Sequence, residues 1–327
     1  MNLRQFAAIL LSDRDVEVRR TTDYLVYCAV RVFICIVQSL SLDACHRLAK
    51  GIAWLAVDVL AVRHKVIDDN LAKVLTHLTP GQRKKVSRDM WEHLLLMVFE
   101  IAHVPRKVHE TNWTEFVHFT DKPLMVRYLL DERPLIFVTG HIGNFEVAGY
   151  MSALFGFPTY TVARALDNPY LNRWVNDFRS AKGQFIVPKH GSAGQLERVL
   201  EEGKTITLLG DQHAGPKGCW VEFLGREASC HKAVSVFTIT SGAPMMVVYN
   251  VRTDGPLKFE LGVVDVTDPQ DDVPQMGGIR ELTRWYNLML AKAICLAPEQ
   301  YWWIHRRWKE KPPRKKKKAK PKIQQAA

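Results

Sequence analysis

The stretch Pro134-Leu-Ile-Phe-Val-Thr-Gly-His-Ile-Gly-Asn-Phe-Glu146 combines the features of a buried strand with those of a helix start. Residues 135–138 form a short, continuous apolar run, which is typical of a strand covered on both faces. Apolar residues then recur with helical spacing at Phe145, Ala148 and Met151. The stretch therefore predicts a strand, a loop that contains two glycines and a helix, in that order.

The same alternation of strand-like and helical segments continues along the chain. We predict further strands at residues 159–163, 185–187, 205–209, 245–251 and 259–266, and helices at 169–182, 194–202, 233–240 and 279–295. Short buried strands that alternate with helices predict an α/β fold with a largely parallel central sheet flanked by helices. Ligands of such sheets bind at the carboxyl ends of the strands.

Polar residues gather at three of these predicted strand ends. They are the segment 141–146, Arg164, and the pair Asp211 and Gln212. We expect these residues to share one edge of the sheet and to form a site there. The alternative for Arg164 and Asp211 is a structural ion pair, which also produces clusters of charge.

A histidine followed five residues later by an acid is weak evidence by itself, because this spacing occurs three times in the chain. The pairs are His64/Asp69, His141/Glu146 and His305/Glu310. Only the middle pair directly follows a predicted buried strand. Gly140 and Gly143 flank its histidine and would let a substrate approach the backbone.

His141 and Glu146 suit the transfer of an acyl chain from a thioester to a hydroxyl group. A neutral histidine can accept the hydroxyl proton near pH 7. Glu146 would hold the ring tautomer and stabilise the imidazolium, as the acid of a catalytic triad does. Backbone N–H groups of Gly143 and Asn144, at the helix start, would stabilise the oxyanion. No covalent acyl-enzyme is needed, and the chain has no Gly-x-Ser-x-Gly motif.

Several blocks, in order, carry a resemblance to a known family. They are Asn70-Leu-Ala-Lys-Val-Leu, Gly140-His-Ile-Gly-Asn-Phe-Glu, Ala163-Arg-Ala-Leu-Asp-Asn-Pro-Tyr-Leu, Leu209-Gly-Asp-Gln, Val221-Glu-Phe-Leu-Gly-Arg-Glu-Ala, Ser241-Gly-Ala-Pro and Pro298-Glu-Gln-Tyr-Trp-Trp-Ile-His-Arg-Arg-Trp-Lys. The sequence resembles the lysophospholipid acyltransferase superfamily, in the branch of the bacterial lipid A biosynthesis (lauroyl/myristoyl) acyltransferases. The resemblance covers roughly residues 45–309, and it departs from the family pattern at His213 and Cys230.

The resemblance implies a glycerolipid acyltransferase-like fold on the cytoplasmic face of the inner membrane. It implies transfer of a fatty acyl chain from acyl carrier protein, or from acyl-CoA, to a hydroxyl of a lipid A precursor, with no cofactor and no metal. His141 and Glu146 would be catalytic. The implied substrate-binding residues are Asn144, Arg164, Asp211 and Gln212, with Arg164 suited to a phosphate of the acceptor. The departures at His213 and Cys230 put the exact acceptor in question.

The positive charge of the chain belongs to its C-terminal end. The formal net charge is +11, and the segment from Arg306 onward contains eleven Lys or Arg and one acid, which accounts for +10 of it. The high pI is therefore not that of a nucleic-acid-binding domain, and we expect no specific nucleic-acid partner. We predict a disordered tail at 310–327 that binds an anionic membrane surface. The alternatives are a solvated tail without function and a tail that makes transient, unspecific contact with RNA or DNA.

Two N-terminal segments predict contact with a membrane. Residues 24–40 are seventeen largely apolar residues with one arginine, which is marginal for a bilayer span, and 42–60 has the pattern of an interfacial amphipathic helix. The alternative is two buried helices of a globular domain.

We divide the chain into a polar N-terminus at 1–23, membrane-associated helices at 24–62, an acyltransferase domain at 63–309 and the tail. The six cysteines contain no Cys-x-x-Cys pair and predict a reducing environment.

Other functions remain open at this point. The same chemistry could act on a phosphoinositol mannoside, an ornithine lipid or a lysophospholipid. A protein of this fold without catalytic activity could instead tether a membrane through its basic tail. A zinc site built from His213, Cys219, Cys230 and His231 would have none of the common ligand spacings. The aromatic run Tyr301-Trp-Trp303 predicts core or membrane-interface packing rather than a binding site.

Overall fold

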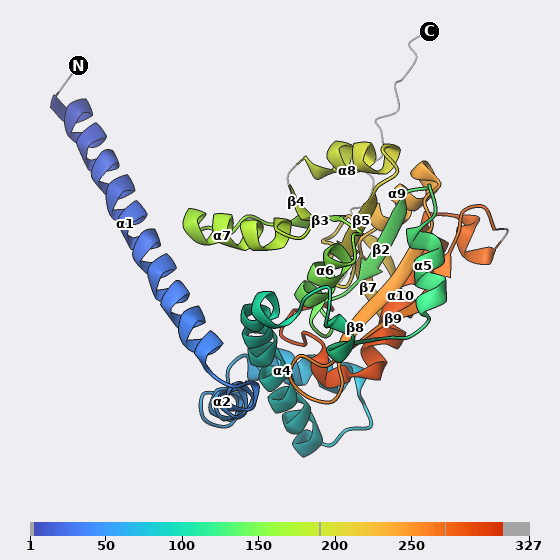
Figure 1. Ribbon diagram of the computed structural model, residues 1–327, viewed down its shortest axis with the longest axis horizontal. Helices are drawn as coiled ribbons and strands as arrows, with labels where there is room; N and C mark the ends of the chain where they lie inside the picture. Colours follow the sequence, from blue (N-terminus) through green and yellow to red (C-terminus); the bar gives the residue numbers. More distant parts are fainter. Residues whose placement is uncertain (1–2, 190, 272, 310–327) are drawn as a thin grey trace, which may run out of the picture.

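The central sheet contains the six strands that the sequence predicts, including the one before His141, and a seventh at 117–119 that it does not predict. The computed structural model describes residues 3–189, 191–271 and 273–309, so the predicted basic tail at 310–327 lies outside the described residues. Within them, a seven-stranded sheet has the order β1-β9-β8-β2-β5-β3-β4 (Figure 1). Its strands are β1 (Val117–Phe119), β2 (Leu135–Thr139), β3 (Thr159–Ala163), β4 (Gln184–Pro188), β5 (Thr205–Leu209), β8 (Met245–Arg252) and β9 (Phe259–Thr267).

Most neighbouring strands of this sheet run parallel. In the described part of the chain, β8 and β9 are its one antiparallel pair, and they form a hairpin next to β2. A separate two-stranded hairpin joins β6 (Cys219–Phe223) to β7 (Arg226–Cys230), which the sequence analysis did not anticipate. The prediction of a largely parallel sheet flanked by helices is confirmed.

Strand β2 is apolar throughout because helices cover both of its faces. Ile136 and Val138 belong to the larger hydrophobic core, with residues of α8 (Ser192–Glu201), α9 (Ala233–Ser241) and α10 (Ile279–Leu296). Leu135 and Phe137 belong to a second core, which α4 (Pro80–Lys107), α5 (Lys122–Leu129) and α6 (Phe145–Leu154) complete. The apolar run at 135–138 is therefore explained by burial of both faces of the strand, as the sequence analysis assumed.

The N-terminal helices differ in extent from the prediction. Helix α1 (Leu3–Ser39) begins well before residue 24 and projects away from the body of the protein (Figure 1). Its part Val18–Ser39 is long and apolar enough to cross a membrane, judged by length and composition, and only 6% of its apolar 18-residue window is buried. Helix α2 (Leu42–Trp54) continues as a π-helical turn, η1 (Leu55–Val59), and α3 (His64–Val74) follows. Large apolar side chains are exposed along both α1 and α2, including Leu25, Phe33, Ile36, Leu48, Ile52 and Trp54.

Helix α4 joins the N-terminal helices to the sheet domain. The Gln38 side chain of α1 donates a hydrogen bond to the Ala102 carbonyl in α4, and His46 of α2 is 2.8 Å from the Glu92 carboxylate. Helix α7 (Pro169–Ser180) has no buried residue and contacts both α1 and β4. Three short 3-10 helices complete the described chain: η2 (Trp113–Glu115), η3 (Pro274–Gly277) and η4 (Pro298–Gln300).

Candidate active site

His141 and Asp211 meet at the carboxyl edge of the sheet. Thr139 of β2 is in register with Leu209 of β5, so the residues two positions beyond each strand end lie side by side. The Nδ1 atom of His141 is 2.8 Å from Oδ1 of Asp211. Gly140 permits this approach, because a Cβ atom there would lie 3.1 Å from the Asp211 Cβ.

The environment of this pair favours the charged forms of both groups. Burial lowers the pKa of His141, but the charge and hydrogen bond of Asp211 outweigh it and the pKa is raised above its ordinary value. Burial raises the pKa of the Asp211 carboxyl, and the contact with His141 more than reverses that shift. Since Asp211 accepts the proton of Nδ1, the Nε2 atom of His141 is the one that can act as a base.

Glu146 does not hold the His141 ring, contrary to the sequence-based expectation. Its carboxylate forms a bidentate ion pair with Arg179 of α7. Arg179 Nε donates to Oε2 at 3.0 Å, and Nη2 donates to Oε1. Glu146 lies in the first turn of α6, and its charge makes a smaller contribution than Asp211 to raising the pKa of His141. The hydrogen-bonding partner of the histidine is therefore Asp211, which the sequence analysis had assigned to substrate binding.

Gln212 lies against the free side of the His141 ring. Its Nε2 atom is 3.2 Å from His141 Nε2 and can donate to the lone pair of that atom. A reacting hydroxyl would approach the same lone pair. Gln212 also lines the cavity next to His141, and its role in substrate binding stays a prediction.

The Trp302 side chain forms a wall of the site that the sequence analysis missed. Its ring centroid is 4.7 Å from that of His141 and 5.6 Å from that of Phe145. The backbone N–H of Trp302 donates to the His141 carbonyl, and Tyr301 pairs with Ile142 in an isolated antiparallel bridge. The C-terminal segment therefore adds a short antiparallel contact to the loop that carries the histidine.

Asn144 is fully buried and does not line the cavity described below, so no contact in the structure supports its predicted role in substrate binding. Its Oδ1 atom caps α6 by accepting from the Val147 N–H, and its Nδ2 atom donates to Glu100. The backbone N–H of Asn144 donates to the Asn250 carbonyl. The N–H of Gly143 donates to the Gln300 carbonyl, so neither of the predicted oxyanion donors is available.

Arg164 and the two residues that depart from the family pattern lie in different surroundings. Arg164 follows β3, is largely exposed, pairs with Asp167 and lines the cavity described next. Cys230 is buried and accepts a hydrogen bond from Arg307 Nη2 at 2.9 Å. The His213 N–H donates to Nε2 of His305. Neither His213 nor Cys230 lines the cavity, whereas the neighbouring His231 does.

A cavity of about 860 Å³ opens beside His141 and extends beneath α6. Near the histidine it is lined by Phe145, Gln212 and Trp302, with Arg164 and Lys189 contributing positive charge. Elsewhere its lining is largely apolar. Three aromatic rings lie together there, Trp113, Phe119 and Phe155, with centroids 5.0–5.7 Å apart. The arrangement is a charged opening, a histidine base and a long apolar interior.

Sequence comparison finds relatives of known name among bacterial acyltransferases. The chain is 23% identical over 323 residues to the lipid A biosynthesis lauroyltransferase of Escherichia coli (strain K12), covering 95% of this chain and 97% of that protein. It is 26% identical over 193 residues to the lipid A biosynthesis palmitoleoyltransferase of the same organism, covering 57% of this chain and 59% of that one.

A solved structure and a family profile complete the comparisons. The crystal structure of the 1-acyl-sn-glycerophosphate acyltransferase from Thermotoga maritima matches 79% of this chain and 98% of its own, at 12% identity and a TM-score of 0.38. The profile of the bacterial lipid A biosynthesis acyltransferases matches residues 12–310. This chain belongs to the bacterial lipid A biosynthesis acyltransferase family.

Proposed function

We propose that the protein transfers a fatty acyl chain from an acyl thioester, with acyl carrier protein as the favoured donor, to a hydroxyl group of a lipid A precursor. The observation that carries this proposal is the position of the His141–Asp211 pair at the mouth of a long apolar cavity. Family membership supports both the acyl donor and the lipid acceptor. Acyl-CoA is the second candidate donor.

In the proposed mechanism His141 acts first as a base and then as an acid. Nε2 removes the proton of the acceptor hydroxyl while the hydroxyl oxygen attacks the thioester carbon. The bond to sulfur breaks as the tetrahedral intermediate collapses, and the imidazolium returns its proton to the leaving thiolate. Asp211 stabilises the imidazolium between these steps, as the acid of a triad does. The reaction is then balanced without a cofactor.

Two groups near Nε2 can stabilise the negative charge on the reacting oxygen. The Gln212 amide lies 3.2 Å from Nε2 and can turn its N–H groups toward the thioester oxygen. The start of α6, at Phe145 and Glu146, contributes the positive end of a helix dipole next to the cavity. Arg164, at the opening, suits a phosphate group of the acceptor because a guanidinium binds phosphate with two parallel hydrogen bonds.

The apolar interior of the cavity is the proposed binding site for the acyl chain, and its aromatic end is expected to limit chain length. Replacing Phe155 with alanine removes one ring of that end. We expect kcat/KM to shift toward longer donors by about fourfold for each added methylene, since burial of one methylene is worth about 0.8 kcal/mol. A series of acyl donors that differ in length measures this shift.

Phe185 offers a matched control for that variant. It is a half-exposed phenylalanine of β4 that does not line the cavity. Phe185→Ala should leave the chain-length preference unchanged. An identical profile for Phe155→Ala and the wild type would contradict the assignment of this end of the cavity to the acyl chain.

Membrane attachment is proposed to place the site next to its lipid acceptor. The exposed apolar residues of α1 and α2 face away from the described core and suit the lipid side of a bilayer or its interface. We propose that the protein resides at the inner membrane with the catalytic domain on the cytoplasmic face. An anionic lipid surface is the proposed partner of the basic segment beyond residue 309.

Mass spectrometry of membrane glycolipids tests this function in cells. Cells that lack the protein should contain a lipid A form with one acyl chain fewer, and expression of the wild type but not of His141→Ala should restore it. Unchanged lipid A together with altered phospholipids would point to another lipid acceptor. If His141→Ala restored the chain as well as the wild type, the proposed catalytic role would be wrong.

A further inference from the structure

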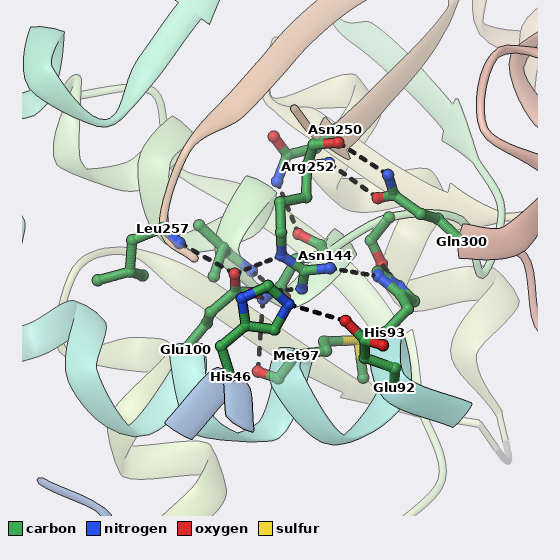
Figure 2. Close-up of polar contacts among 12 residues, drawn as sticks. His46, Glu92, His93, Met97, Glu100, Asn144, Asn250, Arg252, Leu257 and Gln300 are labelled. Atoms are coloured by element: carbon green, nitrogen blue, oxygen red, sulfur yellow. Dashed lines mark hydrogen bonds and ion pairs between the residues drawn. The ribbon is translucent and has the colours of Figure 1, made fainter. Parts of the chain in front are cut away.

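A buried ion pair lies directly beneath the loop that carries His141. Glu100 of α4 is fully buried, and its two carboxylate oxygens accept hydrogen bonds from Nε and Nη2 of Arg252, both at 2.6 Å (Figure 2). Arg252 ends strand β8, which lies next to β2. A bidentate ion pair of this kind fixes both side chains in one relative orientation.

Glu100 also holds two groups besides Arg252. Its Oε2 atom accepts from the Asn144 side chain at 3.0 Å, and its Oε1 atom accepts from the Leu257 N–H at 3.0 Å. A buried carboxylate is costly unless its acceptor positions are filled, and four donors fill them here. Through Asn144, which caps α6, the carboxylate is connected to the end of the catalytic loop.

His93, about two helical turns before Glu100 on α4, makes a second connection to the same loop. Its Nδ1 atom lies 2.8 Å from Arg252 Nη1, which can only donate. Its Nε2–H therefore donates to the Gly143 carbonyl, at 3.2 Å. Burial, together with the charge of Arg252, lowers the pKa of His93 to about 3. The ring is therefore neutral near pH 7, with its proton on Nε2.

The opposite side of the loop is held by backbone groups. Gly143 donates to the Gln300 carbonyl and Asn144 donates to the Asn250 carbonyl. The Gln300 side chain in turn bonds to the N–H and the carbonyl of Arg252. Gly143 and Asn144 are thus fixed from both sides, two and three residues from the reacting histidine.

We infer that Glu100, Arg252 and His93 are positioning residues for acyl transfer, which set the backbone at Gly143 and Asn144 and thereby hold the His141 ring against Asp211. This inference rests on the proposed function. A displacement of about 1 Å in a reacting group can reduce a rate about 100-fold, so a rigid support two residues away has a direct effect on turnover.

The structure offers a control ion pair that is similar in chemistry but distant from the site. Arg133 precedes β2, at the opposite end of the strand from His141, and binds Asp268 through two hydrogen bonds of 2.8 and 2.9 Å. Asp268 is buried, as Glu100 is. Loss of this pair should reduce stability without moving the catalytic loop.

The test uses two variants of His93, and Asp268→Asn serves as the control. His93→Gln keeps a donor and an acceptor, whereas His93→Leu fills the space and leaves Gly143 and Arg252 without their partner. We expect His93→Leu to lower kcat for acyl transfer at least tenfold with KM within about threefold of the wild type, by analogy with other misplaced groups. His93→Gln should recover most of the loss, and Asp268→Asn should keep kcat within about threefold.

The titration of His141 provides a readout that does not need turnover. The charged or titratable groups that face its ring are Asp211, Glu146 and His305. The pH dependence of its modification by diethyl pyrocarbonate, followed by peptide mass spectrometry, should give a pKa above the ordinary histidine value in the wild type and in Asp268→Asn. His93→Leu should lower that pKa, because a displaced ring loses part of its contact with Asp211.

The outcomes separate this inference from the proposed function. If His93→Leu kept the kcat and the His141 titration of the wild type, the positioning role would be wrong. The same holds if His93→Gln lost as much activity as His93→Leu while the His141 titration was unchanged in both. If the wild type transferred no acyl chain but His93→Leu still shifted the His141 titration, the positioning role would stand and the proposed function would fail.

Discussion

Asp211→Asn is expected to lower kcat for acyl transfer by about 10³- to 10⁴-fold, the loss that follows when the acid of a catalytic triad is replaced by its amide. The Asp211 carboxylate accepts the Nδ1 proton of His141 and so keeps Nε2 free to act as a base. An amide can donate to Nδ1 instead, which places the ring proton on Nε2 and removes the base. KM should change little, because Asp211 is buried behind the ring.

Glu146→Gln is the matched comparison, since both residues are acids of the predicted site. Glu146 bonds to Arg179 rather than to His141, so its loss should cost about tenfold through the position of α7 and the local charge. The measurement is kcat at saturating donor and acceptor, with the unfolding of each variant followed in parallel. A larger loss for Glu146→Gln than for Asp211→Asn would contradict the assignment of Asp211 as the partner of the base.

Gly143→Ala is expected to destabilise the protein by roughly 3–5 kcal/mol and to lower activity about 100-fold in the protein that still folds. Gly143 has a φ of +56°, and a Cβ atom would lie 1.8 Å from the Asn250 carbonyl oxygen. That oxygen already accepts the Asn144 N–H. The loop would therefore have to move away from β8, and His141 would move with it.

Gly156, at the other end of α6, supplies the control for this prediction. It has a similar φ of +82°, but a Cβ atom there would meet nothing within 4 Å. Gly156→Ala should cost only the backbone strain, about 1–2 kcal/mol, with kcat unchanged. Chemical denaturation and steady-state kinetics on both variants give the comparison. Equal losses of activity in the two would show that contact with Asn250 is not what fixes the catalytic loop.

The parallel sheet was predictable because each of its central strands is a separate apolar run between helical segments. The site was predictable in part for a related reason, since His141, Arg164 and Asp211 all follow strand ends. The pairing of His141 with Glu146 was wrong because it relied on spacing along the chain. The pairing with Asp211 arises from strand register, and equal offsets from two adjacent strand ends are the signal that could have identified it.

The supporting residues of the site could not be predicted because no local pattern marks them. Glu100 lies inside a long helix, and its partners Asn144 and Arg252 are 44 and 152 residues away. Trp302 belongs to an aromatic run whose other two members, Tyr301 and Trp303, are buried in the core. Only the packing of α4, β8 and the C-terminal segment around one loop gives these residues a role.

Acyl transfer by the purified protein is the measurement that tests the central claim most directly. The wild type in phospholipid vesicles would be supplied with lauroyl-acyl carrier protein and a lipid A precursor that has a free hydroxyl, and the products would be analysed by mass spectrometry. We expect the wild type to form the acylated lipid, and His141→Ala to form it at least about 10³-fold more slowly. Transfer at the wild-type rate by His141→Ala, or no acylated lipid from the wild type with either thioester donor, would contradict the account.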